Sequence, residues 1–334
     1  MPMPRFLLVP AALAAGVFAP GVCAPHLALA QPADSVRSIL RTVDVRTGRV
    51  ETVHAERRHF EAPNWSRDGR YFVVNSGGRL YRLTALGAAP RAVGRLEEIP
   101  TGAARQINND HGLSPDGRRL VFSHAVPAPG TAPDSAWLAS RLYVVPVAGL
   151  APAGTALPAP VTPEAPSFWH GWSPDGRTLA YVGRRGGEWD IYTIPVGGGA
   201  ERRLTKCPGL DDGPDYAPGG DWVYYNAVCS GTMQLWRVRP DGTGTEQLTR
   251  DAYSNWFPHP SPDGRWVVYI AYLEDQGDRH PFGKQVKLRL MDRRDGSVRD
   301  LTPPFTGGQG TLNVPSWSPD SRRVAFVAYE VGGR

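Results

Sequence analysis

The sequence predicts an all-β fold, a six-bladed β-propeller built from four-stranded antiparallel blades. Three observations support this prediction. A short motif repeats six times, strand-like segments flank each copy, and no window of 12 or more residues keeps a 3.6-residue apolar period. Repeats of about 40–50 residues with such flanks are typical of propellers, with one blade for each copy.

The repeated motif is Ser-Pro-Asp-Gly-Arg or a degenerate form of it. Successive motif serines lie 48, 59, 44, 44 and 57 residues apart, with Ala217 in place of the fourth serine. Glycine supplies the positive φ that a tight hairpin needs, so each Asp-Gly predicts a turn between two strands. The copies are Trp65–Arg70, Leu113–Arg118, Trp172–Arg177, Tyr216–Gly220, Pro260–Arg265 and Trp317–Arg322. We expect the motif aspartates to be structural, because each carboxylate can accept backbone N–H groups of its own turn.

Blade three shows the plan of a blade most clearly. Strands are predicted at 167–172, 178–182 and 190–194, and a fourth strand is predicted to end at Thr205. Each segment is rich in β-branched and aromatic residues and is bounded by Gly, Pro or Asp. Blades four and five repeat this plan, whereas blade two carries a Pro- and Ala-rich insertion at Pro127–Ser135.

The ring is predicted to close by pairing the two ends of the chain. The last copy, Trp317–Tyr329, offers only two strands before the chain ends. Near the other end, Ile39–Val45 and Val50–Val53 have the pattern of a third and a fourth strand, with a turn between them. Together these four segments complete the sixth blade, and closure removes the exposed edges that an open arc of sheets would have.

Residues 1–30 are predicted to be a signal peptide, and residues 31–334 the propeller. Arg5 precedes an apolar stretch at Phe6–Ala19, and Ala28–Ala30 provides small residues at both cleavage-site positions. We therefore expect an exported protein. No stretch reaches the roughly 20 apolar residues of a membrane span. The net charge of +5 comes without a Lys- or Arg-rich run, so a nucleic-acid partner is not expected.

Two cysteines follow the predicted cleavage site, Cys207 and Cys229. The blade pattern puts both on loops at the same end of the propeller. An oxidising compartment would allow them to form a disulfide. Two unpaired thiols are the alternative, and the sequence leaves both open.

The repeated Ser-Pro-Asp-Gly-Arg, followed by an apolar strand, by Ile-Tyr or Leu-Trp and by Asp-Gly, resembles the TolB-type β-propeller family. The resemblance covers essentially all of residues 31–334 and implies a six-bladed propeller in the periplasm. It does not imply the role of TolB in the Tol–Pal envelope system. Only about thirty residues separate the predicted cleavage site from the first motif, so we expect a TolB-like protein without the TolB N-terminal domain.

Two other propeller families bear on whether the chain is an enzyme. Similar propellers precede the hydrolase domain of prolyl-oligopeptidase-type peptidases, but this sequence contains no Gly-x-Ser-x-Gly nucleophile elbow. Serine peptidase activity is therefore not expected. Oligogalacturonate lyases have similar repeats and use histidines and a metal on one face, which makes a carbohydrate lyase or hydrolase the alternative function.

The candidate site is predicted at the end of the channel opposite the Asp-Gly turns. Three residues before the motif serine, four blades have proline, which fixes φ at the start of the strand. The other two blades have His111 and His170 there instead. The repeat does not explain these two titratable groups, so they are the candidates for a catalytic acid and base.

The residues around this position are polar and aromatic, and three interpretations remain open. They are a hydrated channel mouth, a binding site for a polar small molecule, a saccharide, a peptide segment or an envelope protein, and a catalytic site. No cofactor is assigned firmly, although a divalent metal on His111, His170, His259 and Gln309 is one option, and calcium on Asp211, Asp212 and Asp215 is another. The candidate ligand-binding residues are Asn109, Asp110, Trp169, Asp211, Asp212, Asp215, Trp256, His259, Gln309 and Asn313.

Overall fold

The computed structural model describes residues 36–85, 94–148, 152 and 154–332. The predicted signal peptide, residues 1–30, lies outside the described residues. Within the described ranges, no helix is long and apolar enough to cross a membrane.

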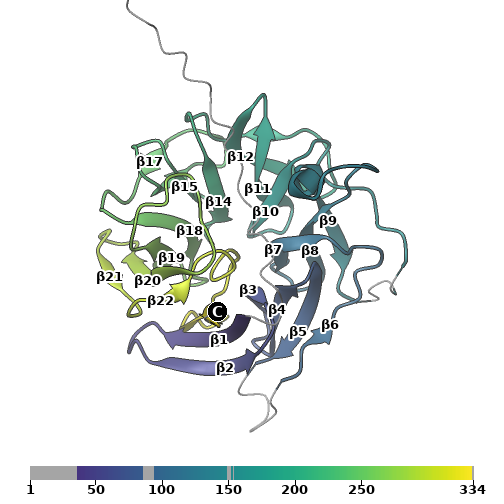
Figure 1. Ribbon diagram of the computed structural model, residues 1–334. Helices are drawn as coiled ribbons and strands as arrows, with labels where there is room; N and C mark the ends of the chain where they lie inside the picture. The colour runs from purple at the N-terminus through teal and green to yellow at the C-terminus, as the bar shows by residue number, and fades with distance from the viewer. Residues whose placement is uncertain (1–35, 86–93, 149–151, 153, 333–334) are drawn as a thin grey trace, which may run out of the picture.

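Six small antiparallel sheets form a ring around a central channel, which confirms the six-bladed propeller (Figure 1). Blades one to three contain β3 (Glu61–Trp65), β4 (Tyr71–Ser76), β5 (Arg79–Thr84) and β6 (Glu97–Glu98); β7 (Ile107–Leu113), β8 (Arg119–Ala125) and β9 (Ser140–Pro146); and β10 (Ser167–Trp172), β11 (Thr178–Arg185), β12 (Glu188–Pro195) and β13 (Arg202–Arg203). Blades four and five contain β14 (Asp211–Tyr216), β15 (Val223–Ala227), β16 (Gln234–Val238) and β17 (Glu246–Gln247); and β18 (Ser254–Pro260), β19 (Trp266–Tyr272), β20 (Lys284–Asp292), β21 (Val298–Asp300) and β22 (Phe305–Gly307).

The sixth blade joins the two ends of the chain, as the sequence predicts. Strand β23 (Arg323–Val331) pairs antiparallel with β1 (Val36–Asp44) along the whole of β1, and β1 pairs with β2 (Val50–Glu56). A bridge between Trp317 and Val324 provides the innermost position. Because the ring closes through backbone hydrogen bonds, neither β1 nor β23 is left as an open edge.

Blade two departs from the four-stranded plan, with three named strands in its described part. At its outer edge, Val161 N–H donates to the carbonyl of Leu142, and Leu142 N–H donates to Thr162 Oγ1. These two bonds take the place of a fourth strand. A short 3₁₀ helix, η2 (Pro133–Ala139), begins within the predicted insertion and extends beyond it, between β8 and β9.

The motif turns are held by a repeated set of hydrogen bonds. In blade three, Ser173 Oγ donates to Asp175 Oδ1 at 2.6 Å and accepts the N–H of Thr178 at 2.9 Å, while Asp175 also accepts the N–H of Arg177. Four further blades repeat this set around Asp68, Asp116, Asp263 and Asp320. The motif aspartates thus bind their own turns, which explains their repetition.

Replacing one motif serine should measure what this turn contributes. We expect Ser173→Ala to lower the free energy of unfolding by about 1 kcal/mol, because both hydrogen bonds of the hydroxyl are lost from a nearly buried position. Urea denaturation measures the change. The exposed Ser230→Ala is the matched control, with an expected change within about 0.5 kcal/mol. Equal effects of the two substitutions would contradict a structural role for the motif.

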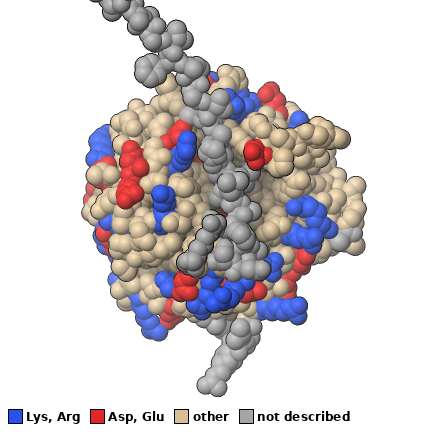
Figure 2. Space-filling view, in the orientation of Figure 1, with Lys and Arg blue, Asp and Glu red and all other residues tan. Residues whose placement is uncertain are grey.

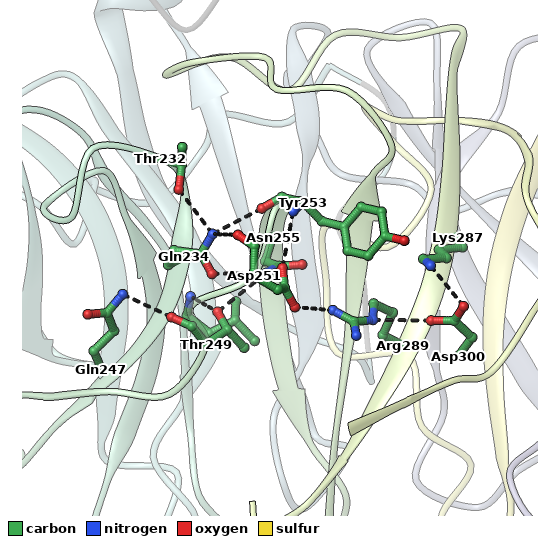
Figure 3. Close-up of polar contacts among 11 residues, drawn as sticks. Thr232, Gln234, Gln247, Thr249, Asp251, Tyr253, Asn255, Lys287, Arg289 and Asp300 are labelled. Atoms are coloured by element: carbon green, nitrogen blue, oxygen red, sulfur yellow. Dashed lines mark hydrogen bonds and ion pairs between the residues drawn. The ribbon is translucent and has the colours of Figure 1, made fainter. Parts of the chain in front are cut away.

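Polar side chains also connect neighbouring blades, as Figure 3 shows between blades four and five. Gln234 of β16 donates to the backbone carbonyls of Asp251 and Tyr253, and Asn255 of β18 donates to Gln234 Oε1 and to Asp251 Oδ1. Arg289 of β20 binds the other oxygen of Asp251. This network fixes the seam between the two blades.

A disulfide joins Cys207 and Cys229, whose Cα atoms lie 5.8 Å apart. The structure therefore decides between the two states that the sequence left open. The bond links the loop before β14 to the loop after β15, both in blade four, and closes a segment with a sequence separation of 22 residues.

Candidate functional site

A cavity lies at the channel mouth, opposite the motif turns, with about 50 Å³ of space for water-sized groups. Its wall combines carboxylates, imidazoles and amides with large aromatic rings. The lining residues are Asn108, Asn109, Asp110, Trp137, Phe168, His170, Val182, Trp189, Leu210, Asp212, Phe257, His280, Gln309 and Asn313. Five blades contribute to it, so no single blade forms the site alone.

Six of the twelve candidate residues from the sequence line this cavity. They come from blades two, three and four and from the loop before the last motif: Asn109, Asp110, His170, Asp212, Gln309 and Asn313. The other six do not line it: His111, Trp169, Asp211, Asp215, Trp256 and His259. All six of these are buried.

β-Bulges turn the polar side chains into the channel. In β10, Trp169 pairs with Tyr181 and Gly171 with Ala180, so His170 is the extra, unpaired residue of a bulge. The innermost strands β7 and β14 have register shifts at the corresponding place, around Asp110 and next to Asp212. A bulge changes the direction of the side chain it carries. The blade scaffold thereby presents these groups to one point instead of pairing them within the sheet.

His170 lies between two carboxylates and donates from both ring nitrogens. Its Nδ1 faces the carbonyl of Asn313 at 3.1 Å, and its Nε2 lies 3.2 Å from Asp212 Oδ1 and 4.0 Å from Asp110 Oδ1. Burial alone would lower the pKa of His170, but the negative charge of Asp110 and the bond to Asp212 raise it to about 9. His170 is therefore an imidazolium at neutral pH.

The two carboxylates beside His170 differ in protonation. Burial would raise the pKa of Asp212, but the hydrogen bond and the charge of His170 hold it below its usual value. Burial raises the pKa of Asp110 to about 7, against the opposing charge of His170. Asn108 Nδ2 donates to Asp110 Oδ2 at 2.5 Å. At neutral pH the site thus holds one fixed carboxylate, one imidazolium and one carboxyl group that titrates.

His111 occupies the same motif position in blade two but has a different environment. It is fully buried, and its Nε2 contacts the carbonyl of Val73 at 3.2 Å. Burial lowers its pKa to about 4, so the ring is neutral. Among the described residues, no carboxylate lies within ion-pair distance of His111, in contrast to His170. The two histidines that the sequence placed together are thus chemically distinct.

The other buried candidates lie behind or below the cavity. His259 lies 3.0 Å from Asp215 through Nδ1 and 3.0 Å from the carbonyl of Leu312 through Nε2. Trp169 lies over Gly112, where a Cβ would come within 2.2 Å of the indole. Trp256 packs against His280 with ring centroids 4.7 Å apart. These residues support the wall of the cavity from outside.

Asp211 points away from the cavity toward the disulfide. Cys207, Asp211 and Cys229 are the single group of three or more potential metal-ligating side chains that comes within 4.8 Å in the described part of the chain. Both sulfurs are used in the disulfide. The two ligand sets considered from the sequence do not form such a group. One set contains His111, His170 and His259, and the other contains Asp211, Asp212 and Asp215. The residues present therefore do not fit either metal set considered from the sequence.

Sequence reasoning missed one titratable residue of the cavity, His280. It comes from the loop between β19 and β20, and its Nε2 lies 3.7 Å from Asp212 Oδ2. Burial lowers its pKa, against the charge of Asp212. Loops between second and third strands lie at this end of every blade, so the length of the 273–283 loop was a usable signal. Nothing in the sequence indicated that His280 would lie close to blade four.

An aromatic wall closes one side of the cavity. Trp137 of η2, Phe168 of β10 and Trp189 of β12 lie with ring centroids 6.0 to 6.2 Å apart. On the other side Phe257 stacks on His170 at 5.6 Å, with an interplanar angle of 20°. Phe257 has a φ of 53°, a left-handed conformation that few non-glycine residues adopt. Asn226 Oδ1 accepts its N–H at 2.9 Å and holds that backbone in place.

Charges of both signs are interspersed around the rim of the face in Figure 2, without a continuous basic patch. The surface in this view therefore gives no electrostatic reason for nucleic-acid binding.

Comparison with known proteins identifies the family. Residues 163–302 match the model of the TolB β-propeller domain. An uncharacterised protein of Agrobacterium fabrum is 44% identical over 298 residues, which cover 89% of this chain and 94% of the relative. The chain belongs to the TolB-type β-propeller family.

Two further relatives carry the TolB name. A solved structure from Agrobacterium tumefaciens, provisionally named TolB, is 42% identical, with a TM-score of 0.78 and coverage of 89% of this chain and 99% of that one. The Tol-Pal system protein TolB of Bordetella pertussis is 29% identical over 40% of this chain and 37% of its own length. The similarity thus spans nearly the whole of the two Agrobacterium proteins, but only part of the Bordetella protein.

Proposed function

We propose that this chain is an exported TolB-like propeller that binds a polar ligand, or a polar segment of an envelope protein, in the cavity at the channel mouth. One observation carries the proposal. The six blades share a motif, but the residues that line the cavity differ from blade to blade. His170 in particular stands where four blades have a structural proline. Architecture does not require an imidazolium between two buried carboxylates, whereas recognition of a polar group does.

The proposed location rests on the predicted signal peptide and agrees with a relative named for the Tol-Pal system. The small cavity volume favours a narrow group, such as one side chain or one substituent of a larger ligand. The rest of such a ligand would lie over the loops around the mouth.

The alternative, a carbohydrate lyase or hydrolase with His111 and His170 as acid and base, has less support. His111 is a neutral residue that does not line the cavity. His170 already donates from both nitrogens, so it has no free lone pair with which to accept a proton.

A ligand screen tests the binding proposal. The full chain is heated with saccharides, uronates, short peptides, alcohols and amines, and the melting temperature is compared with that of Asp212→Asn. A ligand at 100 times its Kd adds ~2.7 kcal/mol, so at least one class should raise the melting temperature of the wild type and not of the variant. No shift with any class, or equal shifts in both proteins, would overturn the proposal.

A further inference from the structure

We propose that the group bound in this cavity is an organic ammonium, such as the end of an aminoalkyl chain. This inference rests on the proposed function and names the chemical class of the ligand. Four features of the cavity support it: its hydrogen-bond acceptors, its aromatic wall, its volume and its net charge.

The charged groups of the cavity offer acceptors to a ligand, and one buried amide donor, Asn109 Nδ2, also lacks a hydrogen-bond partner. The two N–H groups of His170 already bind Asn313 and Asp212. His280 Nε2 lies 3.7 Å from Asp212 Oδ2, beyond hydrogen-bond distance, and the negative charge of Asp212 favours the tautomer of the neutral ring with its proton on Nε2. Its Nδ1 then carries a lone pair, has no hydrogen-bond partner and is buried in a side chain that is 10% exposed. A ligand that donates hydrogen bonds to this nitrogen and to the carboxylates of Asp110 and Asp212 would satisfy all three.

The aromatic wall favours the same class. The faces of Trp and Phe carry a negative quadrupole, and a cation near such a face is stabilised by about 0.5–2 kcal/mol. Three neighbouring rings, Trp137, Phe168 and Trp189, line the same cavity as the carboxylates. The combination of aromatic faces and carboxylates suits an ammonium with its attached methylene groups, because one part is charged and the other apolar.

The volume excludes bulkier groups from the enclosed part. A water molecule needs about 10–15 Å³ of such space, so the roughly 50 Å³ here accommodates only a few water-sized groups. An ammonium with one methylene group fits such a space, whereas a hexose ring does not.

The charge balance completes the argument. Asp212 and His170 form a pair whose charges cancel, and His280 is neutral. Asp110 is faced by His170 on β10, Asp212 on β14, Glu61 on β3 and Asn108 on its own strand. Burial raises the pKa of Asp110 to about 7 and raises the pKa of Glu61 as well. Above pH 7 the cavity therefore gains a net negative charge, which favours a cation and opposes a carboxylate ligand.

The test compares three probes of one shape on the full chain, with calorimetry as the readout: butylammonium, its alcohol butanol and its anion butyrate. We expect butylammonium alone to bind at pH 8, and to bind about tenfold more weakly at pH 6, where roughly a tenth of Asp110 is ionised. Asp212→Asn should reduce the affinity at least tenfold. Glu274→Gln, which removes an exposed charge from the loop of His280, should leave it unchanged.

Each failure has a distinct meaning. Three results with the wild-type protein would each overturn the ammonium assignment. They are butanol binding as tightly as butylammonium, butyrate binding more tightly, and butylammonium binding equally at pH 6 and pH 8. If saccharides or peptides shift the melting temperature through Asp212 and butylammonium does not bind, the ammonium inference fails and the proposed function stands. If no class binds, the proposed function fails as well.

Discussion

His170→Ala should lower the free energy of unfolding at pH 7 by about 3–5 kcal/mol, which is typical for removal of one partner from a buried ion pair. The substitution leaves Asp212 and Asp110 buried beside each other without a cation, and it removes the ring that stacks on Phe257. Urea denaturation of the two proteins measures the difference.

A second substitution separates the charge effect from lost packing. In His170→Ala with Asp212→Asn, the carboxylate that depends most on His170 becomes a neutral amide. We expect the double variant to recover part of the loss, because the buried unpaired charge is gone while the cavity left by the ring is the same. A double variant that is no more stable than His170→Ala would show that packing, not charge, explains the effect.

The pH dependence of the wild type follows from the same group. The pKa of His170 rises from 6.5 in the unfolded chain to about 9 in the folded protein. Its stabilising contribution is thus fully present below pH 6.5 and is lost as the pH rises through 9. Asp110 acts in the same direction from pH 3.8 to about 7. Stability should therefore fall between pH 7 and 9. The double variant, which lacks His170, should show a shallower fall over that range.

Removal of the disulfide should have the second largest effect. For a closed loop of about 22 residues, the chain-entropy model gives a stabilisation of about 3 kcal/mol. We expect Cys207→Ser with Cys229→Ser to lose about this amount in guanidinium denaturation. The buried Asp211 beside the bond, whose pKa burial raises to about 8, would remain in place.

A reductant provides the control for the disulfide. It should lower the stability of the wild type to that of the double serine variant and leave the variant unchanged. If reductant lowers both proteins equally, or if the variant is as stable as the oxidised wild type, the bond does not stabilise the propeller.

Part of the site was predictable because the repeat provides an alignment of blades within one chain. Comparison of the six copies singled out His170, Asp212 and Asn313, since they lie at fixed distances from the motif at positions where the blades are not all alike. The same comparison also selected His111, which lies in a different environment. Position within a blade is visible in the repeat, whereas the direction of a side chain depends on the bulge that carries it.

The missed residues share a physical reason. His280 and Trp137 lie on loops between second and third strands, and these loops differ in length from blade to blade, so the alignment of the repeats could not assign them a position. Their proximity to Asp212 and Phe168 arises only when neighbouring blades pack together.

The sequence by itself determined the number of blades, the structural role of the Asp-Gly turns and the closure of the ring by β1 and β23, and it predicted the end of the channel at which the candidate site lies. All of these follow from local periodicity and turn chemistry. The tertiary structure decided the disulfide, the ion pair of His170 with Asp212 and the protonation of Asp110. Those depend on distances between blades and on burial, and both are set by the packing of residues far apart in the chain.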